Sequence, residues 1–203
     1  DARLISSKFA LGVDTMNVIV EAGPSACTTS YIAMETIDRF AWHMSNIEGV
    51  EQVITLPMAA KQVNAGWNDG SPRWKVLPRD PDTLRQTTQS FETDSGLLNA
   101  DCSAIPVTIF TADHKSTTID RIVAATKKFR ADNNAYDPGF AKKRDAAAAK
   151  AMENGEEYTT DQVNFRLATG PLGVQAATND TVREKEHLIL YLLYGAVFAM
   201  CWI

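Results

Sequence analysis

The sequence predicts an α+β domain that contains two successive strand–helix–strand units. Two apolar segments rich in β-branched residues, 17–22 and 105–112, are each followed by a segment with apolar residues at three- and four-residue spacing. Each unit then closes on a further strand-like segment, residues 50–56 and 162–170. The composition is that of a globular domain able to bury a core, because 45% of the 203 residues are hydrophobic and 22% are charged.

The first unit opens with "NVIVEA", residues 17–22, which ends at a Gly-Pro turn signal. Residues 28–46 predict a helix with one buried face, and either Thr28 or Thr29 is expected to cap its start. "VEQVITL", residues 50–56, predicts a strand that stops at the following proline. The expected buried face of the helix consists of Ile32 or Tyr31, Met34, Ile37, Phe40, Met44 and Ile47.

The second unit repeats this order further along the chain. "IPVTIFTA", residues 105–112, predicts a strand with a proline at its start, where a missing N–H is tolerated. Residues 117–130 predict a helix that Thr117 and Asp120 begin in the manner of a capping box. "QVNFRLATG", residues 162–170, alternates between apolar and polar residues and is the clearest strand signal in the chain. The side chains expected to face the core are Ile119, Ile122, Val123, Phe129, Val163, Phe165 and Leu167.

Two such units in tandem predict the split βαβ, ferredoxin-like arrangement, an antiparallel four-stranded sheet with helices on one face. Two additions depart from its minimal form. Residues 57–104 form a long insertion between the second and third strands, with one helix expected after Asp80 as cap and Pro81 as first helical residue. Residues 138–154 predict an additional alanine-rich helix before the last strand.

The end of the chain, residues 188–203, contains no charged side chain and no polar stripe. A helix of this length reaches about 24 Å, short of the ~30 Å hydrocarbon core of a bilayer. We interpret the run as the truncated beginning of a transmembrane helix that follows a domain of residues 1–187, and Tyr191, Tyr194 and Trp202 suit interfacial positions. The alternative is a core helix of a soluble domain, which would need burial on every side.

Charge and motif content argue against several functions. The net charge of −5 argues against a nucleic-acid partner, which requires clustered basic residues. The cysteines lack CxxC spacing and the three histidines fall in separate elements, so neither a metal site nor a cofactor is predicted. We find no grouping of nucleophile, acid and base, and we therefore predict no catalytic residues and no enzymatic activity.

Two cysteines are placed to form a disulfide. In the split βαβ topology the end of the first strand lies beside the beginning of the third, because these neighbours run antiparallel. Cys27 follows the first strand by a few residues, and Cys102 precedes the third. A bond between them would close a loop of about 75 residues and contribute about 4 kcal/mol in the chain-entropy model. It requires an oxidising compartment, and the alternative is two buried free thiols.

The segment "VNAGWNDGSPRWKVLP", residues 63–78, combines two tryptophans and an arginine with many turn residues. Trp67, Arg73 and Trp74 are our candidates for a patch that lines an apolar ligand path or docks a partner. The alternative is a satellite core in which these side chains attach the long insertion to the sheet.

Four segments give the chain a family resemblance: "ETIDRFAWHMSNIEGVEQVITLPMAAKQVNAGWNDG", "WKVLPRDPDTL", "GLLNADCSAIPVTIFTADHK" and "NFRLATGPLGVQAATNDTV". Together they resemble the RND superfamily exporters, and most closely the predicted exporters related to the MMPL and hopanoid-transporter proteins. The resemblance covers nearly all of residues 13–182 and keeps the family order. It implies the first periplasmic loop of such an exporter, between transmembrane helices 1 and 2, built from βαβ porter subdomains.

The resemblance also implies a function and a location. We expect a proton-driven exporter of apolar or amphipathic molecules or lipids, located in the bacterial inner membrane with this region in the periplasm. Its partners would be the bilayer, the remainder of the same transporter chain and possible further copies in a homo-oligomer. The proton-relay carboxylates would belong to transmembrane helices outside this chain. The alternatives are a stand-alone periplasmic binding or adaptor domain anchored by one C-terminal helix, and an enzyme on the same scaffold.

Overall fold

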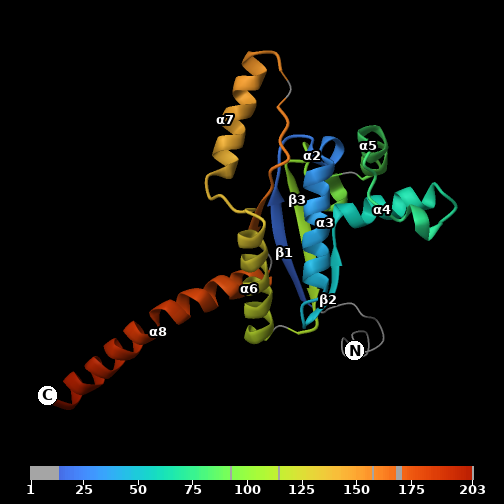
Figure 1. Ribbon diagram of the computed structural model, residues 1–203. Helices are drawn as coiled ribbons and strands as arrows, with labels where there is room; N and C mark the ends of the chain where they lie inside the picture. Colours follow the sequence, from blue (N-terminus) through green and yellow to red (C-terminus); the bar gives the residue numbers. More distant parts are fainter. Residues whose placement is uncertain (1–13, 92, 114, 157, 168–170, 203) are drawn as a thin grey trace.

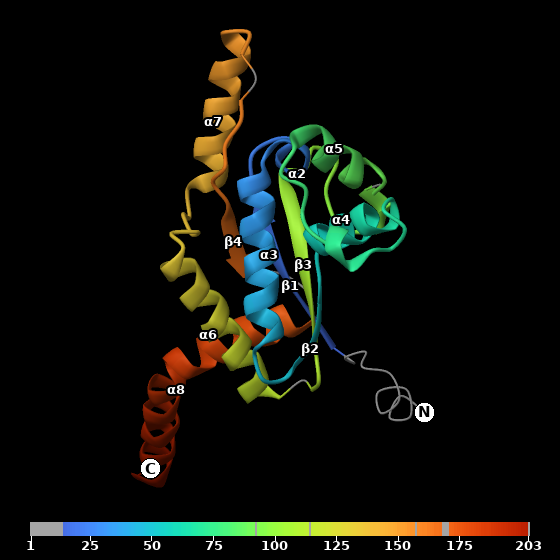
Figure 2. The same cartoon turned by 45° about the vertical axis from the view of Figure 1, so that its right-hand side comes forward.

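The computed structural model describes residues 14–202 apart from residues 92, 114, 157 and 168–170. The described part is a mixed α+β structure with one antiparallel sheet of four strands and seven α-helices. The strands lie in the order β2-β3-β1-β4. Helices α3 and α6 pack on one face of this sheet, and two further helices, α7 and α8, extend away from the body (Figures 1 and 2).

All four strands fall within or beside the segments that the sequence predicts. The central pair is β1 (Asp14–Glu21) and β3 (Ala104–Thr111), which are antiparallel along their whole length. Strand β2 (Val50–Ile54) pairs with β3, and β4 (Asn164–Leu167) pairs with β1. The end of the last predicted strand, residues 168–170, lies outside the described residues.

Alternating side chains of the two central strands explain why the sheet has one buried face. Every second residue is buried, whereas the residues between them are only half-buried. This two-residue period places the apolar side chains on the face that α3 and α6 cover, as expected for a sheet with one packed face. The buried apolar residues of the two strands are Met16, Val18, Val20, Ile105, Val107 and Ile109.

The first predicted helix is divided into two by Ser30. The short helix α2 (Ala26–Thr29) precedes α3 (Tyr31–Ser45), and the Ser30 side chain accepts a hydrogen bond from the Ala33 amide at 3.0 Å. The cap predicted at one of the preceding threonines is therefore wrong. Both threonine hydroxyls donate to the Ser25 carbonyl inside the short helix instead. Serine, with its backbone extended, supplies the oxygen that the first turn of α3 needs.

The long insertion contains more helix than the sequence predicts. The helix expected after Asp80 is confirmed, because the Asp80 carboxylate accepts from the Thr83 amide at 2.9 Å. Pro57 was expected only to end the second strand. It lies instead in the first turn of a helix that Thr55 caps. The helical segments of this region are α4 (Leu56–Gly66), η1 (Pro72–Trp74), α5 (Pro81–Gln89) and η2 (Thr93–Ser95).

Helix α6 (Ser116–Asp132) buries the face that the sequence predicts, but its start differs from the predicted capping box. It begins one residue earlier, so that Thr117 lies inside the first turn. Asp113 organises this end of the helix instead: its carboxylate accepts from the Thr118 hydroxyl at 2.7 Å and pairs with the Lys115 ammonium at 2.7 Å. The Asp113 carboxylate, which precedes the helix start, thus replaces the predicted local cap.

Because of Asp113, the stability of the fold is expected to change with pH in the acidic range. Hydrogen bonds from Lys115 and Thr118 lower the pKa of Asp113 to about 2 from its ordinary value of 3.8. Because the folded pKa is the lower one, the carboxylate stabilises the fold above the unfolded pKa, and this stabilisation is lost as pH falls through the folded pKa. We expect the melting-temperature difference between wild type and Asp113→Asn to shrink between about pH 4 and about pH 2. A difference that stays constant over this range in a circular-dichroism series would contradict the assignment.

The last two helices project from the body in different directions (Figure 1). The alanine-rich helix predicted at residues 138–154 is confirmed as α7 (Phe140–Glu153). Helix α8 (Pro171–Trp202) begins beside β1 and α6 and runs without a break across the boundary predicted at residue 188. Among the helices that the structure describes, none has an apolar stretch long enough to cross a membrane.

The predicted disulfide between Cys27 and Cys102 is present, with the two Cα atoms 5.6 Å apart. Both cysteines are buried, whereas Cys201 is free and exposed. Antiparallel pairing of β1 with β3 continues past the strand ends, where the Ser25 amide donates to the Asp101 carbonyl at 2.7 Å. This continued pairing brings the two cysteines together, for the topological reason that the sequence argument used.

Candidate functional site

The three predicted patch residues do not form one cluster. Trp67 follows the end of α4, whereas Arg73 and Trp74 belong to η1. Both tryptophans are about half exposed, Trp67 at 54% and Trp74 at 49%. Trp74 lines a surface cavity of about 660 Å³, whereas Trp67 and Arg73 lie outside its lining. The interpretation of these tryptophans as a satellite core also receives no support from their exposure.

The cavity around Trp74 is formed by α3, α4 and the segment that leads from η1 into α5. One part of its wall is apolar or aromatic, and another part carries charges of both signs. The apolar and aromatic side chains are Tyr31, Trp74, Val76, Leu77 and Pro78. The charged side chains are Glu35, Asp38, Arg39, Lys61, Lys75, Arg79 and Asp80.

Asn64 holds the wall segment against α4. Its side-chain amide is buried and donates to the carbonyls of Trp74 at 2.9 Å and Val76 at 3.0 Å. The chain reverses between α4 and η1 through Asp69 and Gly70, both of which have positive φ angles. One asparagine thus holds the carbonyls on both sides of Lys75, and the segment that carries the Trp74 indole is attached to α4.

An ion pair between α3 and α4 lines both this cavity and a second one. The Lys61 ammonium lies 2.5 Å from the Asp38 carboxylate, and both side chains are partly buried. The second cavity, of about 430 Å³, shares this pair with the first and adds Trp42, which is 72% exposed. We call the two cavities together the α3–α4 groove. Each cavity contributes one tryptophan to its lining, and both share the ion pair.

Two charged groups at the edge of the first cavity keep their charge at neutral pH. The Arg79 guanidinium lies 5.7 Å from the ring centroid of Tyr31, and hydrogen bonding with Tyr31 raises the pKa of Arg79. Hydrogen bonds from Thr83 lower the pKa of Asp80. A fixed cation and a fixed anion therefore stand beside the aromatic wall, which suits a ligand with a polar end.

The described lining of the α3–α4 groove combines aromatic and charged side chains. Among the described residues that line it there is no histidine and no cysteine. Within the described part of the chain, no three or more His, Cys, Asp or Glu side chains are grouped in a way that could hold a metal ion. Aromatic surface beside charges fits a molecule that has an apolar body and a polar or charged group.

Sequence reasoning missed Trp42, Asp38 and Lys61. Trp42 lies on the same helix as the predicted buried face but outside that face, and it is exposed. A large aromatic residue on the polar side of an amphipathic helix is a signal that the sequence contained. No comparable signal pairs Asp38 with Lys61, because the two residues belong to different helices.

No protein-family model and no curated protein matches this chain.

Proposed function

We propose that this chain is a periplasmic domain of an RND-type, proton-driven exporter, a transport and binding module without enzymatic turnover. It contributes part of the substrate path and subunit contacts for the export of apolar or amphipathic molecules. The observation that carries the proposal is the exposed apolar end of α8, which a bilayer and neighbouring transmembrane helices would cover.

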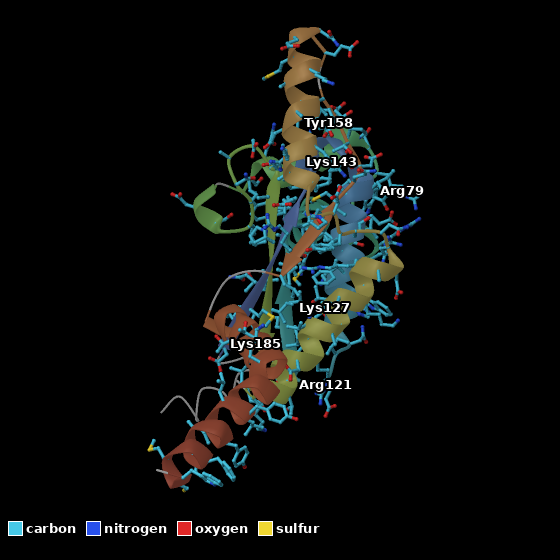
Figure 3. The ribbon with its side chains drawn as sticks, turned by 90° about the vertical axis from the view of Figure 1, so that its left-hand side faces the viewer. Arg79, Arg121, Lys127, Lys143, Tyr158 and Lys185 are labelled. Carbon is cyan, nitrogen blue, oxygen red and sulfur yellow. A yellow bond between two sulfur atoms is a disulfide. The ribbon has the colours of Figure 1, made fainter. Side chains whose placement is uncertain are left out.

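The distal part of α8 presents apolar side chains to solvent on more than one side. A helix of a soluble domain normally buries one stripe and exposes charged residues elsewhere. Lys185 lies nearer to the body on this helix (Figure 3), and no charged residue follows His187. A contiguous exposed apolar surface of this kind is typical of membrane or protein contact. The exposed residues are Leu190, Tyr191, Leu192, Leu193, Tyr194, Val197, Phe198, Met200 and Trp202.

The sheet supports the finer fold assignment in the same proposal. Helix α3 connects β1 to β2, and α6 lies between β3 and β4 in the chain. With the strand order β2-β3-β1-β4 and antiparallel neighbours, this arrangement favours the split βαβ, ferredoxin-like fold expected of a porter subdomain. The buried disulfide is consistent with an oxidising compartment, which in this proposal is the periplasm.

The α3–α4 groove is our proposed contact for the exported molecule, and two tryptophans provide a matched test. We expect Trp74→Ala to weaken binding of the uncharged dye N-phenyl-1-naphthylamine about fivefold or more, since a packed aromatic anchor contributes above 1 kcal/mol. Trp67→Ala removes an indole of similar exposure that lies outside the cavity, and its affinity should equal that of wild type. Fluorescence titration measures both. Equal losses in the two variants, or no saturable binding to wild type, would remove the groove from the proposal.

A stand-alone periplasmic binding or adaptor domain, anchored by one C-terminal helix, is the second candidate. The same exposed end of α8 supports it, because a single anchor needs the same apolar surface. The reading frame of the gene separates the two candidates. Further membrane spans and a second related periplasmic loop downstream support the exporter, whereas a stop codon shortly after the codon of residue 203 supports the anchored domain.

A further inference from the structure

Lys75 is a cation that both cavities of the α3–α4 groove share. It directly follows η1, and its side chain is exposed. Its ammonium has no hydrogen bond and no ion pair with the residues that the structure describes. The other charged side chains of the lining are each held by a partner or lie near an opposite charge. The free charge of the groove is therefore concentrated at this lysine.

Four of the other charges are balanced within the groove. Asp38 and Lys61 form the ion pair between α3 and α4. Arg79 lies over the ring of Tyr31, the first residue of α3 (Figure 3). Hydrogen bonding with Tyr31 raises the pKa of Arg79, and the Glu35 carboxylate raises it further. Two acids are thus matched with two cations, which leaves neither acid for a further cation.

The two remaining charges, Arg39 and Asp80, are engaged at helix ends. The Arg39 guanidinium donates to the Asn133 side chain at 3.2 Å, at the end of α6. Helix α6 lies on the opposite side of α3 from α4 (Figures 1 and 2). The Asp80 carboxylate accepts from the Thr83 amide and caps α5. The lysine that both cavities share is therefore the cation left for a bound group.

The backbone around Lys75 is anchored to its surroundings. The buried Asn64 amide donates to the Trp74 carbonyl at 2.9 Å and to the Val76 carbonyl at 3.0 Å, on either side of the lysine. The Lys75 amide itself donates to the Pro72 carbonyl at 3.1 Å. Because the backbone is held at three consecutive residues, the ammonium is confined to the part of the groove that its own side chain reaches.

We propose that the α3–α4 groove selects amphiphiles whose polar group is an anion, such as a carboxylate, a sulfonate or a phosphate ester, and that Lys75 pairs with this group. Such selectivity rests on the proposed function, because it narrows the class of molecule that the groove takes up. The described lining carries four cations and three acids, in a chain with a net charge of −5. A local excess of positive charge in an acidic protein favours an anion at this place.

The aromatic lining fits the apolar part of the same molecule. Trp74 lines one cavity and Trp42 lines the other, whereas Lys75 lines both. An apolar body can therefore contact an indole in either cavity while its anion stays at the shared lysine.

Two fluorescent dyes that differ by one sulfonate test this selectivity. 8-Anilinonaphthalene-1-sulfonate is N-phenyl-1-naphthylamine with one added sulfonate, so the apolar bodies of the two dyes are the same. We expect Lys75→Gln to weaken binding of the sulfonate dye about fivefold, because a charge-assisted contact is lost. Its affinity for the uncharged dye should equal that of wild type. Fluorescence titration of the 203-residue chain measures both affinities, and circular dichroism checks that the variant is folded.

Arg73→Gln is the matched control for this experiment. Arg73 is an exposed cation two residues before Lys75, and it lies outside the lining of both cavities. We expect this variant to bind both dyes as wild type does. A loss of sulfonate-dye binding equal to that of Lys75→Gln would show that surface charge in general attracts the dye, and it would overturn the pairing.

Trp74→Ala separates the selectivity from the groove itself. It should weaken binding of both dyes, because both carry the apolar body that contacts the indole. If it weakens neither, the groove and its selectivity fail together. If Trp74→Ala weakens both dyes while Lys75→Gln leaves the sulfonate dye unchanged, or weakens both dyes equally, the groove stands and the selectivity for anions is overturned. A loss confined to the sulfonate dye in Lys75→Gln supports the pairing.

Discussion

Replacing both Cys27 and Cys102 by alanine is expected to lower the free energy of unfolding by about 4 kcal/mol. The disulfide closes a loop with a sequence separation of 75 residues. In the chain-entropy model, opening a loop of this length releases conformational freedom in the unfolded chain, which favours unfolding. Because this loop contains α3, β2, α4 and α5, the bond restrains the part of the chain that forms the α3–α4 groove.

Urea unfolding followed by circular dichroism measures this change. Wild type treated with a thiol reductant should approach the double variant, since both lack the same constraint. Cys201→Ala is the matched control, because Cys201 is free and exposed and its removal should change stability by no more than about 0.5 kcal/mol. A double variant within about 1 kcal/mol of oxidised wild type would contradict the predicted role of the bond.

Phe40→Ala is the second large change, with an expected loss of about 4 kcal/mol. Phe40 is fully buried, and its ring centroid lies 5.0 Å from that of Phe129 and 4.7 Å from that of Phe165. It therefore joins α3 to α6 and to β4 at the centre of the core. Truncation removes aromatic surface from this contact and leaves a cavity that the surrounding elements can only partly fill.

Trp42→Ala is the control for this prediction, because it removes a larger aromatic side chain from the same helix. Trp42 is 72% exposed, so the stability change should stay within about 0.5 kcal/mol. Phe40→Leu, which keeps most of the volume, should cost less than Phe40→Ala. Urea unfolding of the three variants measures the order. Similar losses for Phe40→Ala and Trp42→Ala would show that α3 does not pack as described.

Sequence reasoning predicted the strands and the buried faces of the helices because one-sided burial leaves a direct periodic signal. In β4, Phe165 is fully buried while Arg166 beside it is exposed, as the alternation predicted. Asn164 is the exception on the polar side, since its amide bridges Glu21 and the Asp137 backbone and is buried by these contacts.

Helix starts were predicted less well, because several residues able to cap stand close together. Ser30 was overlooked among neighbouring threonines, and its hydroxyl also donates to Asp161, which lies 131 positions further along the chain. At α6, Asp113 replaced Thr117 by reaching the helix start from outside it. The capping residue depends both on local backbone geometry and on contacts with residues far along the chain. The local sequence indicates which residues are able to cap, but it does not show the distant contacts.

The candidate sites depended most on long-range placement. Trp74 was found because two tryptophans in a turn-rich segment are conspicuous, but the structure separates it from Trp67 and Arg73. The Asp38–Lys61 pair was not visible in advance, since it forms only when α3 and α4 lie side by side. The two Arg130 nitrogens, Nε and Nη2, that have no hydrogen-bond partner among the described residues were also not visible in advance, because partners come from other elements.

By itself, the sequence determined the fold class, the one-sided burial of the sheet and the approach of Cys27 to Cys102. Each of these follows from the spacing of apolar residues within an element or from the order of the elements along the chain. The spacing is visible in the sequence because each element buries one apolar face. Only the tertiary structure decided which tryptophan lines a cavity and which buried arginine keeps two guanidinium nitrogens without a hydrogen-bond partner among the described residues. Such features arise from distances between side chains on different elements, and those distances are set when the helices pack on the sheet.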